Sequence, residues 1–250
     1  MAHLTLLHGF SQSGASWDEL LSLLPAGLEV SAPDLRGHGR NPTPPDEPHT
    51  LALCTKDILR TWEDSGVRRT HLVGYSLGGR LALHLAAHHP ERIETLAVIG
   101  AHAGFEGDAR IRRQVEDEAL AARIESEGVD WFATHWAALP LFAGLARRGP
   151  EFLAAVDSRR RLNRPEGLVA VLRGMGGAAT EPFWDRLPAI DAPTLVIVGA
   201  EDEPYLARGR RLVSLIPDAR LELVPGAGHA AHLEQPRAVA TLLEAQLSIR

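Results

Sequence analysis

The chain has 250 residues, 45% hydrophobic and 23% charged, with a formal net charge of -6 at pH 7. This length can bury about 70–75% of the unfolded surface, enough for one sizeable core without metal or disulfide support. The mild negative charge argues against a nucleic-acid partner, and no apolar stretch approaches the ~20 residues of a membrane span. The N-terminal residues lack the features of a signal peptide. The single cysteine, Cys54, cannot form an internal disulfide, so we expect a cytoplasmic protein.

Short apolar runs alternate with longer amphipathic runs along the chain. The short runs predict strands at residues 3–7, 28–32, 70–73, 95–99, 194–198 and 220–224. The longer runs predict helices at residues 16–24, 51–65, 77–88, 206–216 and 236–247. This alternation predicts a mostly parallel sheet covered by helices on both faces. Because the first predicted strand begins at residue 3, we expect the sheet to be shortened at its N-terminal edge.

Residues 105–180 contain no strand candidate. The stretch is charged and shows helical periodicity near residues 111–126, 131–138 and 152–157. We therefore predict a helical lid at 105–180, inserted into a core formed by residues 1–104 and 181–250. Several arginines gather in or near this lid: Arg110, Arg112, Arg113, Arg159, Arg160, Arg161 and Arg164. Two interpretations remain open, namely solvated helix faces and a surface that binds an acidic substrate.

A sharp turn is predicted at Gly74-Tyr75-Ser76-Leu77-Gly78. The run fits the pattern G-x-S-x-G, and it follows a predicted strand and precedes a predicted helix, as this motif requires. Such a strained turn lifts the serine hydroxyl clear of the sheet, while the two glycines leave room for neighbouring backbone. Ser76 is therefore predicted to be the reactive centre.

The serine needs two partners, because its hydroxyl reacts poorly until a histidine accepts its proton and a carboxylate orients that histidine. Asp202 and His229 each follow a later predicted strand, in the order that the motif's fold uses. The carboxyl ends of parallel strands share one edge of a sheet, so these groups should meet Ser76 there. The alternatives that remain open are His232 as the base and Glu201 or Glu203 as the carboxylate.

Two backbone N–H groups are candidates for an oxyanion hole. In folds with this serine turn, one donor follows the serine and the other lies in the loop after an early strand. Here these positions are Leu77 and Phe10, the latter in His8-Gly9-Phe10. One such donor contributes about 3 kcal/mol to the stabilisation of a negatively charged transition state.

Longer motifs resemble one family of enzymes. They are Leu7-His8-Gly9-Phe10, Asp34-Leu35-Arg36-Gly37-His38-Gly39, Ser76-Leu77-Gly78-Gly79-Arg80, Trp136-Ala-Ala-Leu-Pro-Leu-Phe142, Pro165-Glu-Gly-Leu, Leu172-Arg-Gly-Met-Gly176 and Gly226-Ala-Gly-His-Ala-Ala-His-Leu-Glu-Gln-Pro236. Together they resemble the 2-succinyl-6-hydroxy-2,4-cyclohexadiene-1-carboxylate synthases of menaquinone biosynthesis, along nearly the whole chain. The resemblance implies an α/β-hydrolase fold with a helical lid.

The same resemblance implies an unusual reaction for this fold. The triad acts as a base that removes a substrate proton and drives the elimination of pyruvate, without an acyl-enzyme. It implies a small polycarboxylate substrate and neither a metal nor another cofactor. The positions that match the family's substrate-binding residues are Tyr75, Arg80, Arg113, Trp136 and either Arg160 or Arg161, with Arg161 preferred. Independently of the family, the planar guanidinium group of arginine can form two parallel hydrogen bonds to a carboxylate, which the ammonium group of lysine cannot.

Two segments depart from the family's pattern. Glu181 adds a negative charge near a pocket expected to bind anions, and His102-Ala103-Gly104-Phe105 is looser than the family's usual sequence. Both departures bear on the substrate rather than on the fold or the triad. A carboxylesterase or carbon–carbon-bond hydrolase that acylates Ser76 is therefore the first alternative. A non-catalytic ligand-binding protein of the same fold is the second.

Overall fold

The computed structural model describes residues 2–248. Its strands form one six-stranded sheet in the order β2-β1-β3-β4-β5-β6, and all neighbouring strands run parallel. The strands are β1 (His3–Leu7), β2 (Glu29–Ser31), β3 (Thr70–Tyr75), β4 (Ile93–Ile99), β5 (Thr194–Gly199) and β6 (Ala219–Val224). Within the described residues no strand lies beyond β2, so the predicted parallel sheet, shortened at its N-terminal edge, is confirmed.

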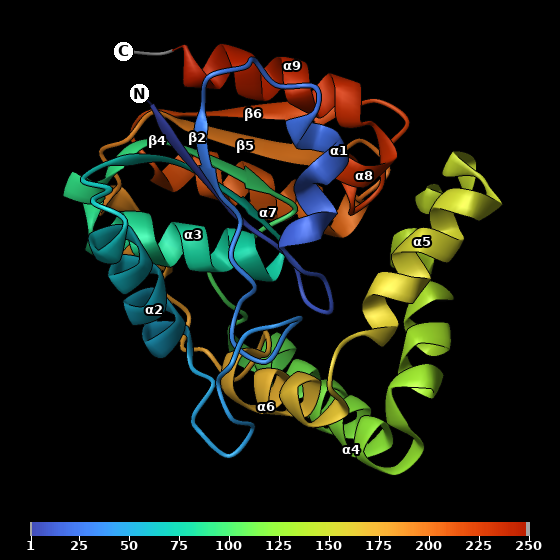
Figure 1. The fold of residues 1–250 in the computed structure, drawn as a ribbon. Coiled ribbons are helices and arrows are strands. Elements are labelled where there is room, and N and C mark those ends of the chain that lie inside the picture. The colour runs from blue at the N-terminus through green and yellow to red at the C-terminus, as the bar shows by residue number, and fades with distance from the viewer. Residues whose placement is uncertain (1, 249–250) are drawn as a thin grey trace.

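Helices cover both faces of the sheet (Figure 1). One face carries α1 (Asp18–Leu21), α8 (Ala231–Glu234) and α9 (Pro236–Leu247), and the other carries α2 (Leu51–Asp64), α3 (Leu77–His88) and α7 (Glu203–Leu215). The strands serve both layers because successive side chains point to opposite faces. In β5, Leu195 and Ile197 join the cluster beneath α9, while Val196 and Val198 join the cluster beneath α3 and α7. Strands buried on both faces explain the nearly continuous apolar runs in the sequence.

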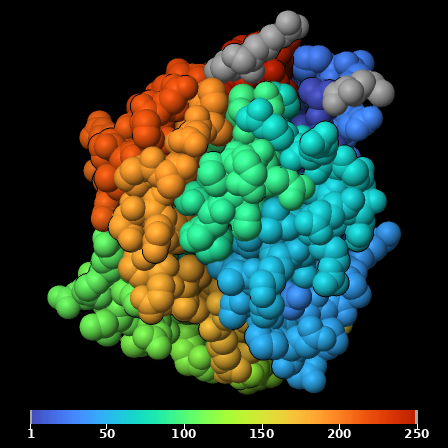
Figure 2. Space-filling view, turned by 90° about the vertical axis from the view of Figure 1, so that its left-hand side faces the viewer, coloured from blue at the N-terminus to red at the C-terminus, as the bar shows by residue number. Residues whose placement is uncertain are grey.

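Short 3-10 helices complete the core: η1 (Gly14–Trp17), η2 (Pro90–Arg92) and η4 (Trp184–Ala189). The segment η4 packs against both α3 and α7. Figure 2 shows the result on one face of the molecule, where the cyan-to-green segments and the orange segments, far apart in the sequence, lie side by side. Segments from both sides of residues 105–180 therefore pack against each other and share one sheet.

Between β4 and η4 the described chain contains only helices: α4 (Gly107–Ala137), η3 (Pro140–Arg148), α5 (Pro150–Arg161) and α6 (Pro165–Met175). Helix α4 changes direction at Gly128, where φ is 78°. Figure 1 shows α4, α5 and α6 grouped outside the two helical layers of the sheet. The predicted boundaries between lid and core stay a prediction. Among the helices of residues 2–248, none has the length and hydropathy required to cross a membrane.

Helix α6 lies within the predicted helical lid, but its residues were not among the segments in which helical periodicity was found. Its sequence contains two glycines and two valines, which lower intrinsic helix propensity. Its buried face, which includes Leu168, Leu172 and Met175, nevertheless packs against α4. Tertiary burial therefore decides the structure of this segment.

Candidate active site

The backbone at Ser76 is strained, with φ 51° and ψ −108° at the junction of β3 and α3. The Ser76 N–H donates to the Ile99 carbonyl at 2.9 Å, which ties the turn to β4. A Cβ atom on Gly74 would lie 2.3 Å from the Gly78 oxygen, and one on Gly78 would lie 2.1 Å from the Leu7 oxygen. Both glycines of the motif are thus required by close backbone approach, and the turn presents the serine hydroxyl above the sheet edge.

Ser76, His229 and Asp202 form a connected triad. His229 Nε2 lies 3.1 Å from Ser76 Oγ, and His229 Nδ1 lies 2.7 Å from Asp202 Oδ2. Asp202 directly precedes α7, and His229 lies in the loop between β6 and α8, so both groups follow strand ends. Since the buried carboxylate accepts the Nδ1 proton, Nε2 is left free to accept the proton of the serine.

The alternative triad members lie elsewhere. Glu201 pairs with Arg147 at 2.9 Å on the surface, and Glu203 is exposed. His232 is buried with its ring 4.3 Å from that of Tyr75, and neither of its ring nitrogens has a hydrogen-bond partner among the described residues. Burial lowers the pKa of His232 to about 3, so it stays neutral. Of the candidate residues, only His229 contacts Ser76, and only Asp202 contacts His229.

The Gly9–Phe10 peptide is held by a buried histidine. The Leu35 N–H donates to His8 Nε2 at 2.9 Å, so the ring proton is on Nδ1, which donates to the Gly9 carbonyl at 2.8 Å. In a planar trans peptide the N–H points opposite to the carbonyl, so this bond orients the Phe10 N–H away from His8. Burial lowers the pKa of His8 to about 4, which preserves this tautomer at neutral pH.

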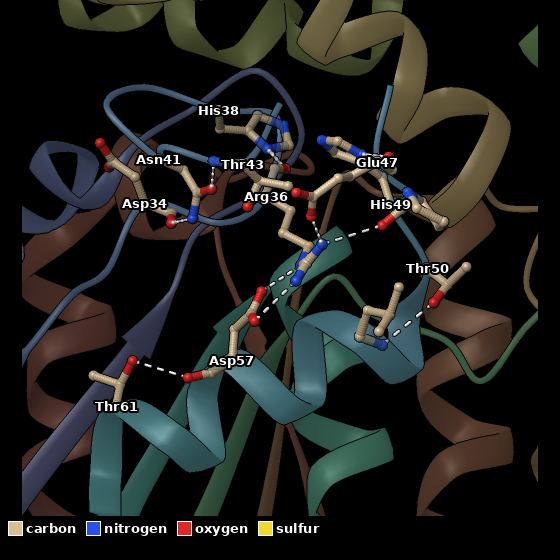
Figure 3. A network of polar contacts seen from close by, with 12 residues as sticks. Asp34, Arg36, His38, Asn41, Thr43, Glu47, His49, Thr50, Asp57 and Thr61 are labelled. Atoms are coloured by element: carbon tan, nitrogen blue, oxygen red, sulfur yellow. Dashed lines mark hydrogen bonds and ion pairs between the residues drawn. The ribbon is translucent and has the colours of Figure 1, made fainter. Parts of the chain in front are cut away.

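The loop after β2 supports this segment through a polar network (Figure 3). The guanidinium of Arg36 binds Asp57 through two contacts, one of them at 3.0 Å, and Asp34 accepts two backbone N–H groups at 2.8 and 2.7 Å. The loop places the ring of His38 edge-on to that of Phe10, with centroids 5.6 Å apart. The polar network thus holds the loop, and the His38 ring on that loop packs against the Phe10 ring.

One cavity contains the Ser76 side chain and both predicted oxyanion residues, Phe10 and Leu77. Its wall combines cationic and aromatic side chains. The cationic residues are Arg80, Arg113 and Arg160, and the aromatic residues besides Phe10 are Tyr75, Phe105, Trp136, Phe142 and Tyr205. The sequence predictions at Tyr75, Arg80, Arg113 and Trp136 thus fall on this wall, whereas Phe105, Phe142 and Tyr205 were not predicted. Tyr205 could have been found, because it lies one helical turn after Asp202.

Arg80 is buried on the first turn of α3 and is only 4% exposed. One of its terminal N–H groups donates to the Met175 carbonyl, and its Nε has no hydrogen-bond partner among the described residues. Burial lowers its pKa to about 10, so it remains charged at neutral pH. A cation at a helix start is also unfavourable. A charged group kept at this cost is typical of a binding site for an anion.

Arg113 on α4 extends toward the same cavity. Its guanidinium lies 2.6 Å from the carboxylate of Asp117, one turn along the helix. That carboxylate is buried, and within residues 2–248 neither of its oxygens has a hydrogen-bond partner with suitable angles, so its contact with Arg113 is a charge contact. The pair is therefore an ion pair that leaves the other N–H groups of Arg113 available to a ligand.

The structure places Arg160 at the cavity and Arg161 outside it. Arg160 is 6% exposed, and burial lowers its pKa. Arg161 instead binds Asp130 and Asp157 on the surface, each at 2.6 Å. Successive residues of a helix point about 100° apart, so only one of the two can face inward. The preference for Arg161 is corrected accordingly.

The structure also shows where Glu181 and Cys54 lie. Glu181 pairs with Arg110 on the surface at 2.5 Å and does not line the cavity, so its charge does not enter the site. Cys54 is buried, and burial raises the pKa of its thiol to about 12, which makes it inert as a nucleophile. In the described part of the chain, no group of three or more His, Cys, Asp or Glu side chains is arranged to hold a metal ion.

Known proteins resemble this chain over nearly its full length. A family described as alpha/beta hydrolase fold matches residues 2–236. The 2-succinyl-6-hydroxy-2,4-cyclohexadiene-1-carboxylate synthase of Enterobacter sp. is 31% identical, over 99% of this chain and 92% of its own. The pimeloyl-[acyl-carrier protein] methyl ester esterase of Aromatoleum aromaticum is 34% identical, over 96% of each chain. The solved structure of MenH from S. aureus has a TM-score of 0.94 and 27% identity, over 98% of this chain and 93% of that one.

Proposed function

Because the chain belongs to the 2-succinyl-6-hydroxy-2,4-cyclohexadiene-1-carboxylate synthase family of the α/β-hydrolase superfamily, we propose that it is a lyase of menaquinone biosynthesis. The substrate would be 2-succinyl-5-enolpyruvyl-6-hydroxy-3-cyclohexene-1-carboxylate, and the products the cyclohexadiene and pyruvate. One observation carries the proposal. The cavity around Ser76 presents three arginines, and this substrate has three carboxylates, on its ring, its succinyl arm and its enolpyruvyl arm.

The proposed reaction begins with the proton on ring carbon C2. This carbon lies beside the succinyl carbonyl and the C3–C4 double bond, so its carbanion is delocalised and the proton is acidic. Ser76 Oγ, whose own proton passes to His229 Nε2, removes it. The electron pair of the C2–H bond forms C2=C3, the former double bond moves to C4=C5, and the C5–O bond breaks. The enolpyruvyl group leaves as an enolate and becomes pyruvate on gaining a proton, for which the His229 imidazolium is the balancing source.

Charge develops in two places during this reaction. On the substrate it develops on the succinyl carbonyl oxygen, where the N–H groups of Phe10 and Leu77 would stabilise it, each by about 3 kcal/mol. On the enzyme it develops on His229, where the carboxylate of Asp202 at 2.7 Å stabilises the imidazolium. The proposed elimination therefore proceeds without an acyl-enzyme.

The arginines would bind and orient the substrate. Arg80 and Arg160 are buried, so water competes poorly with their charge-assisted hydrogen bonds to a carboxylate, and these bonds are correspondingly strong. Planar guanidinium groups also fix the direction of a carboxylate through paired bonds, which would place C2 over Ser76. The aromatic residues, Tyr75 and Trp136 among them, would enclose the ring.

Pyruvate release tests the proposal directly. The substrate is supplied to the purified protein, and lactate dehydrogenase with NADH reports pyruvate as it forms. We expect one pyruvate per substrate consumed, together with the absorbance of the conjugated diene. The Ser76→Ala variant should lose nearly all activity. Substrate that stays intact with wild-type protein would refute the proposed reaction.

An esterase that acylates Ser76 is the second candidate. A specific observation favours it, since a methyl ester esterase is 34% identical to this chain and the triad geometry also suits a nucleophilic serine. A burst of p-nitrophenol from p-nitrophenyl acetate would support it, as would a covalent adduct on Ser76. A non-catalytic role is disfavoured by the assembled triad.

The buried thiol of Cys54 supports a reducing, cytoplasmic location for either enzyme.

A further inference from the structure

We propose that His102 binds the substrate, donating its Nε2 proton to a carboxylate that Arg80 and Arg113 also hold. This inference deepens the proposed function and rests on it for the identity of the substrate. The observations that carry it are the location of the ring on the cavity wall and a hydrogen bond that fixes its tautomer.

His102 lies in the loop that follows β4 and is 6% exposed. It lines the same cavity as Ser76, Arg80 and Arg113. Its ring packs edge-on against Phe105, with centroids 4.6 Å apart. The side chain therefore borders the same ligand space that Arg80 and Arg113 line.

The backbone determines which ring nitrogen carries the proton. The Gly104 N–H donates to His102 Nδ1 at 2.9 Å, so Nδ1 is an acceptor and the proton is on Nε2. Two further bonds hold the loop, since the Ala103 carbonyl accepts from the Phe183 N–H at 2.9 Å and the Gly104 carbonyl accepts from Trp184 at 3.0 Å. No partner for Nε2 is found within residues 2–248, and this nitrogen is not among the fully buried atoms. A fixed donor is thus left for a ligand.

The ring should remain neutral in this environment. Burial holds the pKa of His102 well below its ordinary value, and the charges of Arg80, Arg208 and Arg113 lower it further. A carboxylate offers about four lone-pair positions, and guanidinium groups occupy only some of them. A neutral Nε2–H beside the arginines would complete the coordination of one carboxylate without adding repulsion between cations.

Two amide substitutions separate this role from a purely structural one. In His102→Asn the side-chain oxygen can replace Nδ1 as the acceptor for Gly104, but the donor at the Nε2 position is lost. In His102→Gln the longer amide can replace Nε2 as a donor, but the acceptor for Gly104 is lost. Substrate binding therefore follows the donor if His102 contacts substrate, whereas thermal stability follows the acceptor.

The experiment measures the Kd of the intact substrate by calorimetry in a Ser76→Ala background, together with the Tm of each variant. We expect His102→Asn to weaken binding about tenfold or more with little change in Tm, and His102→Gln to bind within a few-fold of the parent with a lower Tm. His71→Asn, at a buried histidine that contacts Thr95 outside the cavity, is the matched control. It should bind like the parent.

The outcomes distinguish the two proposals. If the Ser76→Ala parent binds the substrate and His102→Asn binds it equally well, the role of His102 is overturned and the proposed function stands. The same holds if His102→Gln loses binding while His102→Asn keeps it, because a structural role predicts that order. If the Ser76→Ala parent does not bind the substrate, the proposed function fails, and the inference about His102 fails with it.

Discussion

Replacing Arg80 with methionine should remove substrate binding and leave the fold at least as stable as before. Methionine fills a similar length of cavity without a charge. Burial lowers the pKa of Arg80 from 12.5 to about 10, which corresponds to about 3 kcal/mol of unfavourable free energy in the folded state. Because the folded state resists carrying this proton, the cost is fully present below about pH 10 and therefore at neutral pH.

The substitution also removes one favourable contact. The bond from Arg80 to the Met175 carbonyl has a charged donor and contributes about 1.5–3 kcal/mol. The free energy of unfolding of Arg80→Met should therefore equal that of the wild type or exceed it by up to about 1.5 kcal/mol. For catalysis, the loss of a buried charge that binds a carboxylate costs about 2–5 kcal/mol, so kcat/KM should fall about 30-fold or more.

Urea unfolding at pH 7 and the pyruvate assay measure the two effects on the same preparations. The slope of unfolding against urea should not change, so that the midpoint reports stability alone. Added substrate should raise the Tm of Ser76→Ala and not that of Ser76→Ala combined with Arg80→Met. The reasoning is refuted if Arg80→Met is destabilised by more than about 2 kcal/mol while kcat/KM is unchanged, because Arg80 would then be a structural residue.

Three further predictions follow from neighbouring groups. Arg160→Met should lower kcat/KM about 30-fold or more, whereas Arg161→Met should change it less than threefold; equal effects of the two would contradict the assignment of Arg160 to the cavity. The pKa of His232 is about 3 when folded and 6.5 when unfolded, so the unfolded chain binds more protons between these values and the wild type loses stability as pH falls from 6.5 toward 3. His232→Phe should reduce that loss and raise the free energy of unfolding at pH 7 by about 1–2 kcal/mol. Urea unfolding at pH 7 and pH 5 measures both effects, and an equal loss of stability between these pH values in the variant and the wild type would contradict the prediction. His8→Ala should lower kcat about 10- to 100-fold with little change in KM, because the Phe10 N–H acts on the transition state; an unchanged kcat in the pyruvate assay would show that His8 does not position that peptide.

The sequence by itself determined the sheet and the turn at Ser76, and it limited the partners of the serine to a few residues in two loops. These features follow from rules that act over a few residues: apolar runs of strand length, and glycines where backbone segments approach closely. The carboxyl ends of parallel strands converge on one edge, so Asp202 and His229 could be placed near Ser76 before their contacts were known. Even so, the choice of Asp202 over Glu201 remained open until burial decided it.

Only the tertiary structure decided what surrounds the triad. The direction in which α5 faces selects Arg160 over Arg161, and no local pattern in that charged helix reveals it. Packing against α4 makes α6 a helix despite its glycines and valines. The tautomer of His102 depends on one N–H in a loop that Phe183 and Trp184 hold from 80 residues away. Burial, charge and protonation depend on neighbours that are distant in the sequence, and these neighbours surround a widely shared triad with three arginines and several aromatic side chains.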